Sequence, residues 1–221
     1  MADTGPEAAS TDQSTDHLKP ARLVEFIECL DGPEDMPASV DFDAIARRID
    51  PRAFDKQELS RLLARMDRLA RDGARLDLSL VSPMTFARLV TNASADQVAA
   101  LMTLPALRKR VLDEVFRRMV EHFRHDRGSK VSGVVHWRLT GGAGVGGYDR
   151  YETIIENGTC VVNSVKTRFP RVTITLNPAD FMRLITGNAS APVLFMTGGL
   201  RVKGDLAFAA GLTGLFRLPH V

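Results

Sequence analysis

Hydrophobic and polar residues alternate regularly from residue 170 onward and predict a series of short strands and helices. Val172–Leu176, VTITL, alternates β-branched and apolar side chains, which is typical of a strand with one buried face. Asn177 supplies a capping side chain and Pro178 a suitable first helical residue, so a helix should begin there. Helical spacing places the large hydrophobic residues of this helix on one face: Phe181, Leu184 and Ile185.

Glycine and proline residues divide the next stretch into three further elements. Residues 191–196 begin with Ala-Pro and predict a second helix, which carries Phe195 and is ended by a pair of glycines. Residues 200–203 are long enough for one more strand. Asp205 then caps a final helix, predicted over residues 206–216.

The final helix has Thr213 as its only polar side chain. A helix that is apolar nearly all round must be covered on nearly every side, and each glycine in its interior costs roughly 1 kcal/mol relative to alanine. Its small residues could pack closely on a neighbour, or the helix could lie over an apolar cavity that holds a hydrophobic ligand. The small face carries Ala207, Ala210, Gly211 and Gly214, and the opposite side Phe208, Leu212, Leu215 and Phe216.

This order of elements resembles the sterol carrier protein type-two (SCP-2-like) lipid-binding domain family. The most specific pieces are residues 176–181, LNPADF, and residues 196–205, MTGGLRVKGD. The resemblance covers the C-terminal half, from about Leu107 to Phe216. It implies an α/β (α+β) fold, in which a twisted five-stranded sheet with helices packed on one face encloses an apolar tunnel. It brings no catalytic residues with it.

The segment before residue 170 supplies one long helix and the remaining strands. Hydrophobic residues at helical spacing predict a helix over residues 107–123. Residues 132–140, SGVVHWRLT, predict a strand with Val135 and Trp137 on one face and His136 and Arg138 on the other. Residues 148–157 and 159–165 should form a hairpin about Asn157-Gly158, which is the strongest two-residue turn signal.

Three domains follow from these patterns: a disordered tail (1–17), a mainly helical extension (18–105) and the lipid-binding domain (106–221). Helices are predicted over residues 18–30 and 42–49, and from a capping box at Asp55 and Glu58 to Gly73. If the extension did not pack on another part of the chain, the stripe of hydrophobic residues from Leu59 to Leu69 would form one exposed patch. We therefore expect the extension to pack onto the C-terminal domain.

Residues 76–95 repeat much of residues 172–191, including Asn-Ala-Ser-Ala at the end of each copy. Both copies could be common strand–turn–helix units built with the same turn chemistry, or they could be a worn partial duplication. Residues 76–80 are therefore predicted as a strand.

Bulk properties exclude several functional classes. The formal net charge is +2, which indicates no strong electrostatic partner, and an aromatic content of 6% with interleaved acids argues against nucleic-acid binding. Residues 1–17 lack the features of a secretory signal, and Cys29 and Cys160 are lone thiols, so we expect a cytoplasmic protein. A transient contact with a membrane surface stays open, and no protein partner is indicated.

Three patterns look like enzyme motifs but have simpler interpretations. Residues 142–147 match G-x-G-x-x-G, yet a strand rather than a helix follows, which favours a hairpin loop. His122 and His125 lack a third metal ligand at suitable spacing. His136 is expected to face solvent. We therefore predict no cofactor and no metal.

The predicted function is to bind a hydrophobic molecule in an apolar tunnel, either only to hold it or also to transfer it, without chemistry of its own. The ligand could be a fatty acyl chain, a sterol-like molecule or another lipid. A non-catalytic interaction scaffold, or an accessory subunit that presents lipid to a partner enzyme, stays the alternative. The candidate ligand contacts, each of which could equally be ordinary core, are Trp137, Phe181, Leu184, Ile185, Phe195, Phe208, Leu212 and Phe216.

Overall fold

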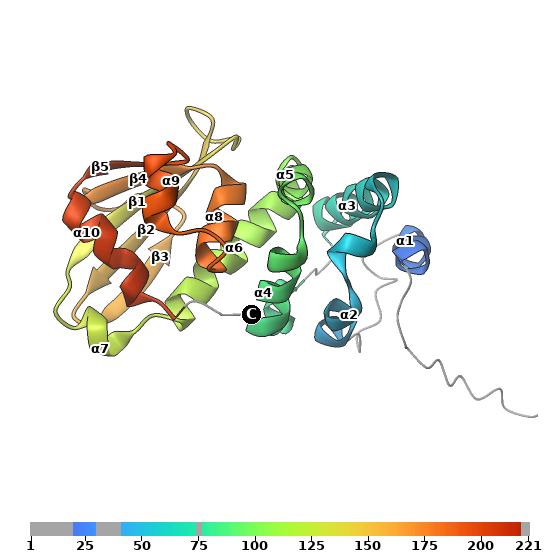
Figure 1. Ribbon diagram of the computed structural model, residues 1–221, viewed down its shortest axis with the longest axis horizontal. Coiled ribbons are helices and arrows are strands. Elements are labelled where there is room, and N and C mark those ends of the chain that lie inside the picture. Colours follow the sequence, from blue (N-terminus) through green and yellow to red (C-terminus); the bar gives the residue numbers. More distant parts are fainter. Residues whose placement is uncertain (1–19, 30–40, 74–76, 218–221) are drawn as a thin grey trace, which may run out of the picture.

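The computed structural model describes residues 20–29, 41–73 and 77–217. A five-stranded sheet with its helices lies beside a group of helices from the N-terminal part, so the molecule is elongated (Figure 1). The disordered tail predicted for residues 1–17 lies outside the described residues.

The five predicted strands are confirmed and form one sheet in the order β3-β2-β1-β4-β5. Strands β1 and β4 run parallel, and the other neighbours are antiparallel. The third strand ends at Asn163 rather than at the predicted residue 165. The strands are β1 (Gly133–Thr140), β2 (Tyr148–Glu156), β3 (Thr159–Asn163), β4 (Val172–Leu176) and β5 (Leu200–Gly204).

Turn chemistry determines both hairpin connections of β2. Asn157 and Gly158 both have positive φ, 51° and 73°, as a two-residue turn of the I′ type requires. The glycine-rich residues 141–147 form the loop between β1 and β2, and no helix follows them. The hairpin interpretation of the G-x-G-x-x-G pattern is therefore confirmed.

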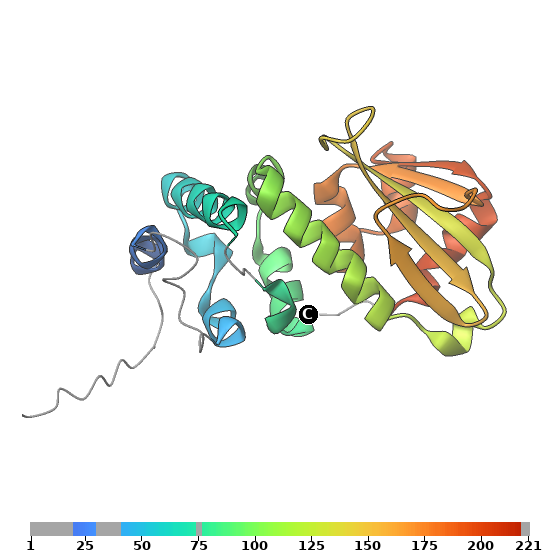
Figure 2. The same ribbon diagram turned by 180° about the vertical axis from the view of Figure 1, so that it is seen from behind.

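Side chains alternate between the two faces of the sheet. Those on one face are covered by α6 (Pro105–Glu121), α8 (Pro178–Ile185), α9 (Ala191–Met196) and α10 (Leu206–Gly211), as Figures 1 and 2 show from opposite sides. The Phe116 ring stacks on the rings of Tyr151 and Phe181, with centroids 4.0 and 5.2 Å apart. These aromatic rings form the centre of the core together with Trp137, whose ring centroid lies 5.6 Å from that of Phe181.

The N-terminal part is helical, as predicted. Its α3 begins with the capping box of Asp55 and Glu58. One hydrophobic cluster, which includes Leu23 and Leu62, joins α1 to α3. A second cluster of Leu63, Ala70 and Leu107 joins α3 to α6. The helices are α1 (Pro20–Glu28), α2 (Phe42–Arg48), α3 (Lys56–Arg71), α4 (Pro83–Asn92) and α5 (Ala95–Met102), with the 3-10 turns η2 (Pro51–Ala53) and η3 (Leu78–Leu80).

A buried carboxylate fastens α3 to the start of α6. Asp67 is only 2% exposed, and its Oδ1 accepts hydrogen bonds from the backbone N–H groups of Ala106 and Leu107, at 3.0 and 3.1 Å. Leu104, the N-cap residue of α6, has no capping side chain of its own. Asp67 thus satisfies orphan N–H groups of a helix that follows about 40 residues later. The extension does pack on the C-terminal part through α3, while the division into domains at residues 105 and 106 stays a prediction.

The strand predicted over residues 76–80 is wrong. Residue 76 lies outside the described residues, and Leu78–Leu80 is a 3-10 turn, because the Asp77 carboxylate accepts from the backbone N–H of Ser79 and no described strand pairs with this segment. The helical halves of the two similar segments do correspond, since Ser82 and Asn177 cap α4 and α8 in the same way. The two copies also touch, through a 3.0 Å hydrogen bond from Asn188 Nδ2 to Thr91 Oγ1.

The predicted final helix is shorter than expected. Asp205 caps it as predicted, through the backbone N–H of Phe208. The α-helix α10 ends at Gly211, however, and continues as the 3-10 helix η4 (Leu212–Leu215). Residues Phe123 and Phe216 then form an isolated bridge. The tighter last turn brings Phe216 against the end of α6.

His136 does not face solvent as expected. It is 5% exposed, and its Nε2 lies 3.2 Å from Glu152 Oε2 and 3.0 Å from the carbonyl oxygen of Arg168. Glu152 itself is fully buried and accepts from the backbone N–H groups of Thr167 and Arg168. The loop of residues 164–171 therefore crosses the outer face of the sheet and is held there by one carboxylate.

Glu152 should make stability depend on pH in the acid range. Burial alone would raise the pKa of this carboxyl, but hydrogen bonds from Thr167, Arg168 and Asn163 outweigh it and lower the pKa to about 2. The stabilisation is complete above the ordinary pKa of 4.5 and is lost as the pH falls toward 2. We expect the gap in unfolding free energy between the parent and Glu152→Gln, measured by urea denaturation, to shrink over this range.

The control is Glu156→Gln, which changes a half-exposed carboxylate on the same strand. Glu156→Gln should lower the free energy of unfolding much less than Glu152→Gln does at every pH above the acid range. A gap for Glu152→Gln that stays constant down to acid pH would contradict the assignment.

Candidate functional site

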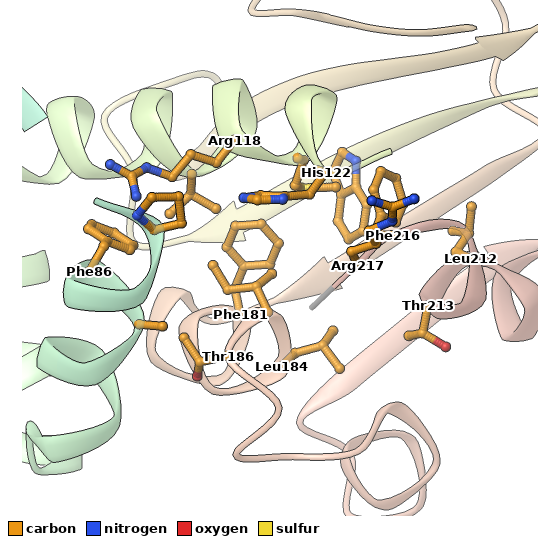
Figure 3. A pocket seen from close by; sticks show the side chains of 16 residues that line it. Phe86, Arg118, His122, Phe181, Leu184, Thr186, Leu212, Thr213, Phe216 and Arg217 are labelled. Atoms are coloured by element: carbon orange, nitrogen blue, oxygen red, sulfur yellow. The ribbon is translucent and has the colours of Figure 1, made fainter. Parts of the chain in front are cut away.

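An apolar pocket lies between the helix-covered face of the sheet and four helical elements. We call it the central pocket. It has about 90 Å³ of space open to a water-sized sphere, and its walls come from α4, α6, α8, η4 and β1. Figure 3 shows Phe181 at its centre, Phe86 and Arg118 at one end, and Leu212 and Thr213 at the other.

Six of the eight candidate ligand contacts line the central pocket. These six are Trp137 from β1, Phe181, Leu184 and Ile185 from α8, and Leu212 and Phe216 from the C-terminal segment. These six positions, which local periodicity and the family resemblance predict, thus lie together in the structure. The Trp137 ring is fixed from behind by a 2.9 Å hydrogen bond from its Nε1 to Thr153 Oγ1.

Phe195 and Phe208 lie outside the pocket lining. Phe195 is 46% exposed, because α9 is a short amphipathic helix that buries only Leu194. Phe208 is buried at the opposite end of α10, where its ring packs against Gly133 and under the Arg171 guanidinium, 4.5 Å from the ring centroid. Neither residue therefore lines the central pocket.

Sequence reasoning missed the walls that come from α4 and α6. The first is Pro83, Phe86 and Ala87, which belong to the N-terminal extension. No local signal marks them, since α4 reaches the pocket only through tertiary packing. The end of α6 adds four further walls: Val115, Arg118, Met119 and His122. The hydrophobic periodicity of the helix could have indicated Val115 and Met119, whereas no apolar spacing marks Arg118 or His122.

Two buried nitrogen atoms at the pocket wall, Arg118 Nη1 and His122 Nε2, have no hydrogen-bond partner among the described residues. The Arg118 side chain is otherwise well anchored: its Nε donates to Glu114, and its Nη2 donates to the carbonyl oxygens of Leu78 and Val81. The Phe86 ring lies 4.8 Å from its guanidinium carbon. In Figure 3 the His122 ring extends over Phe181 toward Arg118.

Glu114 compensates only part of the local positive charge. Burial alone would raise the pKa of this carboxyl, but hydrogen bonds from Arg117 and Arg118 overcome it and lower the pKa, so Glu114 is ionised. It is shared between the two arginines. Since a buried polar atom without a partner costs about 1–3 kcal/mol, Arg118 Nη1 and His122 Nε2 favour a ligand that carries a hydrogen-bond acceptor.

A second apolar cavity lies on the N-terminal side of α6. We call it the helical cavity. It has about 240 Å³ open to a water-sized sphere, and its lining, from α3 to α6 with Met182 of α8, is almost entirely hydrophobic. Phe86 borders both this cavity and the central pocket. The Phe86 side chain thus stands between the two spaces.

Three of the four residues on the small face of the last helix are exposed and do not line the pocket, whereas the fourth, Gly214, is half-buried and its carbonyl oxygen accepts a hydrogen bond from Arg127 Nη1. Ala207, Ala210 and Gly211 are exposed, and a Cβ atom built on Gly211 would meet nothing within 4 Å. Both interpretations offered for this face are therefore wrong, because it faces solvent. The pocket is bordered instead by the large side chains Leu212 and Phe216.

Other candidate chemistry has no support among the described residues. Within them, no group of three His, Cys, Asp or Glu side chains is placed to hold a metal ion. Burial raises the pKa of the Cys160 thiol to about 12, so it stays protonated at neutral pH. In the same part of the chain, no helix has the length and hydrophobicity needed to cross a bilayer.

Comparison with known proteins identifies relatives of the C-terminal part. The model of the SCP-2 sterol transfer family matches residues 112–217. A fatty acid-binding protein of Yarrowia lipolytica is 41% identical over 46 residues, which are 21% of this chain and 36% of that protein, so the match spans about a third of the relative's length.

Two solved structures are similar to parts of this chain. The apo sterol carrier protein 2 of Yarrowia lipolytica aligns with 48% of this chain and 87% of its own, at 23% identity and a TM-score of 0.40. The inverting sec-alkylsulfatase Pisa1 of Pseudomonas sp. aligns with 83% of this chain but only 33% of its own, at 10% identity and a TM-score of 0.42.

The solvent-facing small face leads to a stability prediction. Gly211 has ordinary helical dihedral angles, φ −76° and ψ −18°, so Gly211→Ala should raise the free energy of unfolding by up to about 1 kcal/mol. The matched comparison is Gly128→Ala, whose Cβ would lie 2.2 Å from a ring carbon of the buried Phe123. We expect Gly128→Ala to lower the free energy of unfolding by roughly 1–3 kcal/mol. Urea denaturation measures both, and a loss for Gly211→Ala would mean that the face is covered.

Proposed function

Because residues 112–217 belong to the SCP-2 sterol transfer family, we propose that this protein binds a single hydrophobic ligand in the central pocket. An SCP-2 domain implies lipid binding or transfer. The observation that carries the proposal is the pocket itself, which is apolar and is lined mainly by elements of the matched segment, with α4 of the N-terminal extension closing one end. The proposed wall consists of Trp137, Phe181, Leu184, Ile185, Leu212 and Phe216.

Burial of apolar ligand surface would supply most of the affinity. Each Å² removed from water contributes roughly 25 cal/mol before the costs of association. An acyl chain is the ligand class we favour, since a linear chain suits a narrow space between a sheet and helices. The 41% identity to a fatty acid-binding protein over 46 residues supports this choice.

The central pocket must widen to take a long chain. Its 90 Å³ is below the roughly 300–1,000 Å³ that ligand pockets usually have. The Phe86 side chain could move into the adjoining helical cavity, which has room for it, and so open space beside Arg118. On this proposal the N-terminal extension adds a movable wall that residues 112–217 alone do not contain.

The polar end of the ligand would lie at Arg118 and His122. A carboxylate there would accept hydrogen bonds from Arg118 Nη1 and, in its N–H tautomer, from His122 Nε2, the two atoms that lack partners. The tail would then run past Phe181 toward Leu212. This assignment predicts a preference for acids over alcohols of equal length.

We further propose that the protein has no chemistry of its own and acts in the cytoplasm. It would hold an acyl ligand and release it to an acceptor or to a partner enzyme. The lone cysteines, one of them buried, suit a reducing compartment.

Filling the central pocket should block binding. Ile185 is half-buried at the rim of the pocket, so Ile185→Trp should put a large ring into ligand space at little cost to the core. We expect displacement of a fluorescent fatty acid by palmitate to weaken at least about tenfold, which corresponds to roughly 1.4 kcal/mol.

Phe195→Ala is the control, because it removes a predicted contact that lies outside the pocket lining and should leave binding unchanged. A similar loss in both variants, with normal unfolding midpoints, would place the ligand elsewhere.

The head-group assignment is tested with a pair of ligands and a pair of histidine variants. The parent protein should bind palmitate at least about tenfold more tightly than hexadecanol, since hydrogen bonds to charged groups contribute about 1.5–3 kcal/mol. His122→Phe should reduce this preference. His125→Phe should not, because His125 is exposed and its Nδ1 lies 2.8 Å from the Gly158 carbonyl oxygen. Equal affinity for acid and alcohol in the parent would overturn the assignment while leaving the pocket intact.

A further inference from the structure

The outer face of the sheet, opposite the central pocket, carries a row of arginines. Arg138 of β1 lies directly opposite Arg150 of β2, and its other neighbour, Thr175 of β4, lies opposite Arg201 of β5. Like charges placed directly across a sheet destabilise it. The arrangement therefore has a cost that neither the fold nor the pocket explains.

Lysines extend this row into a basic surface. Lys203 stands two residues after Arg201 on β5, and Lys166 belongs to the loop that crosses the outer face. The pKa of Lys166 is lowered, first by burial and then by the nearby charges of Arg150 and Arg138. We call this set the outer basic face: Arg138, Arg150, Lys166, Arg201 and Lys203.

The carboxylates nearby are already engaged elsewhere. Asp149 pairs with Arg108 at 2.6 Å, Glu156 with Arg168 at 3.0 Å and Asp205 with Arg171 at 2.8 Å. The Glu152 carboxylate accepts hydrogen bonds from the backbone N–H groups of Thr167 and Arg168 in the loop that crosses this face. Arg138 Nε is buried without a hydrogen-bond partner. Within the part of the chain that the structure describes, no salt bridge therefore neutralises the five cations of the outer basic face, although Arg138 and Arg150 both lie against the Tyr148 ring.

Hydrophobic side chains project from the loops that border this face. Phe169 is 98% exposed and Val165 is 69% exposed, both in the loop that Glu152 holds. Val145, at 85% exposed, projects from the β1–β2 loop, where its carbonyl oxygen accepts a 2.6 Å hydrogen bond from Arg150 Nη2. These apolar tips are thus anchored beside the cations.

Outside the loop of residues 164–171, no helix or strand among the described residues covers this face, and Figure 2 shows the strands in front of α8, α9 and α10. A wide hollow of about 600 Å³ lies on it, with Arg138, Lys166, Phe169 and Lys203 among its walls. The hollow and the surrounding cations could admit phosphate-bearing groups without a rearrangement of the strands.

We propose that the outer basic face docks onto the surface of an anionic lipid bilayer. The cations contact phosphate and carboxylate head groups, and Phe169 and Val165 enter the interfacial layer. Charge complementarity supplies the attraction, since basic residues near an anionic surface each add to binding. Duplex nucleic acid shares the charge but offers no apolar layer for an exposed phenylalanine and valine, so the bilayer fits both observations. The central pocket, on the other face of the sheet, stays free to hold its ligand while the protein is docked.

Vesicle co-sedimentation of the full chain tests the proposal. We expect binding to vesicles of phosphatidylcholine with about a third phosphatidylserine, no binding to phosphatidylcholine alone, and loss of binding as salt rises from about 0.1 M to about 0.5 M. The double variant Arg201→Glu with Lys203→Glu changes two exposed side chains and should weaken binding at least about tenfold. Phe169→Ala should weaken it several-fold.

Arg68→Glu is the matched control, because Arg68 is exposed on α3 at the other end of the molecule. It should bind as the parent does, and the fluorescence of the single tryptophan, Trp137, checks that each variant is folded. Equal binding to neutral vesicles, an equal loss in the Arg68→Glu variant, or tighter binding to a short DNA duplex than to anionic vesicles would overturn the proposal.

Discussion

Helix α6 is buried along two of its sides, and the rest of the structure depends on this double burial. On one side Leu112 and Phe116 pack in the core beneath the sheet. On the other side Leu107 meets α3, and Asp67 from α3 caps the start of the helix. Charged residues buried along α6 are paired, since Arg108 binds Asp149 and Arg118 binds Glu114. Because breaking a buried pair is costly, these contacts hold the helical part against the sheet in one arrangement.

The same helix determines where the pocket forms. Arg118 reaches past α6 to the carbonyl oxygens of Leu78 and Val81, and so holds η3 and the start of α4 in place. Phe86 on α4 then closes one end of the central pocket. A side chain that anchors the extension thus also presents a free nitrogen atom to the ligand space. On the proposed function, Arg118 would therefore combine a structural role with a ligand-binding role.

Local chemistry was sufficient to predict most of the fold and part of the site. Asn177, Asp205 and the Asp55–Glu58 box each start a helix through a side chain a few residues away, and Asn157-Gly158 closes a hairpin. The predictions that were wrong or missing concern residues whose structure depends on partners far away in the chain. Residues 78–80 could not be a strand without a neighbouring edge, His136 is buried by a loop that follows 30 residues later, and Phe86 reaches the pocket only because α4 packs on α8. The net charge of +2 likewise gave no sign that cations gather on one face of the sheet, which appears only once the strands are placed in the order β2-β1-β4-β5.

The two faces of the sheet differ because neighbouring residues on each strand point in opposite directions. Trp137 faces the pocket, and Arg138, the next residue, faces outward. The β1 backbone between them is held by eight register pairs to β2 and five to β4, so a contact made by Arg138 is separated from Trp137 by a rigid ladder. Binding on the outer face should then leave the pocket's shape unchanged. On the proposed function, ligand exchange would depend instead on the groups at the ends of the pocket, Phe86 and the 3-10 turn that carries Leu212.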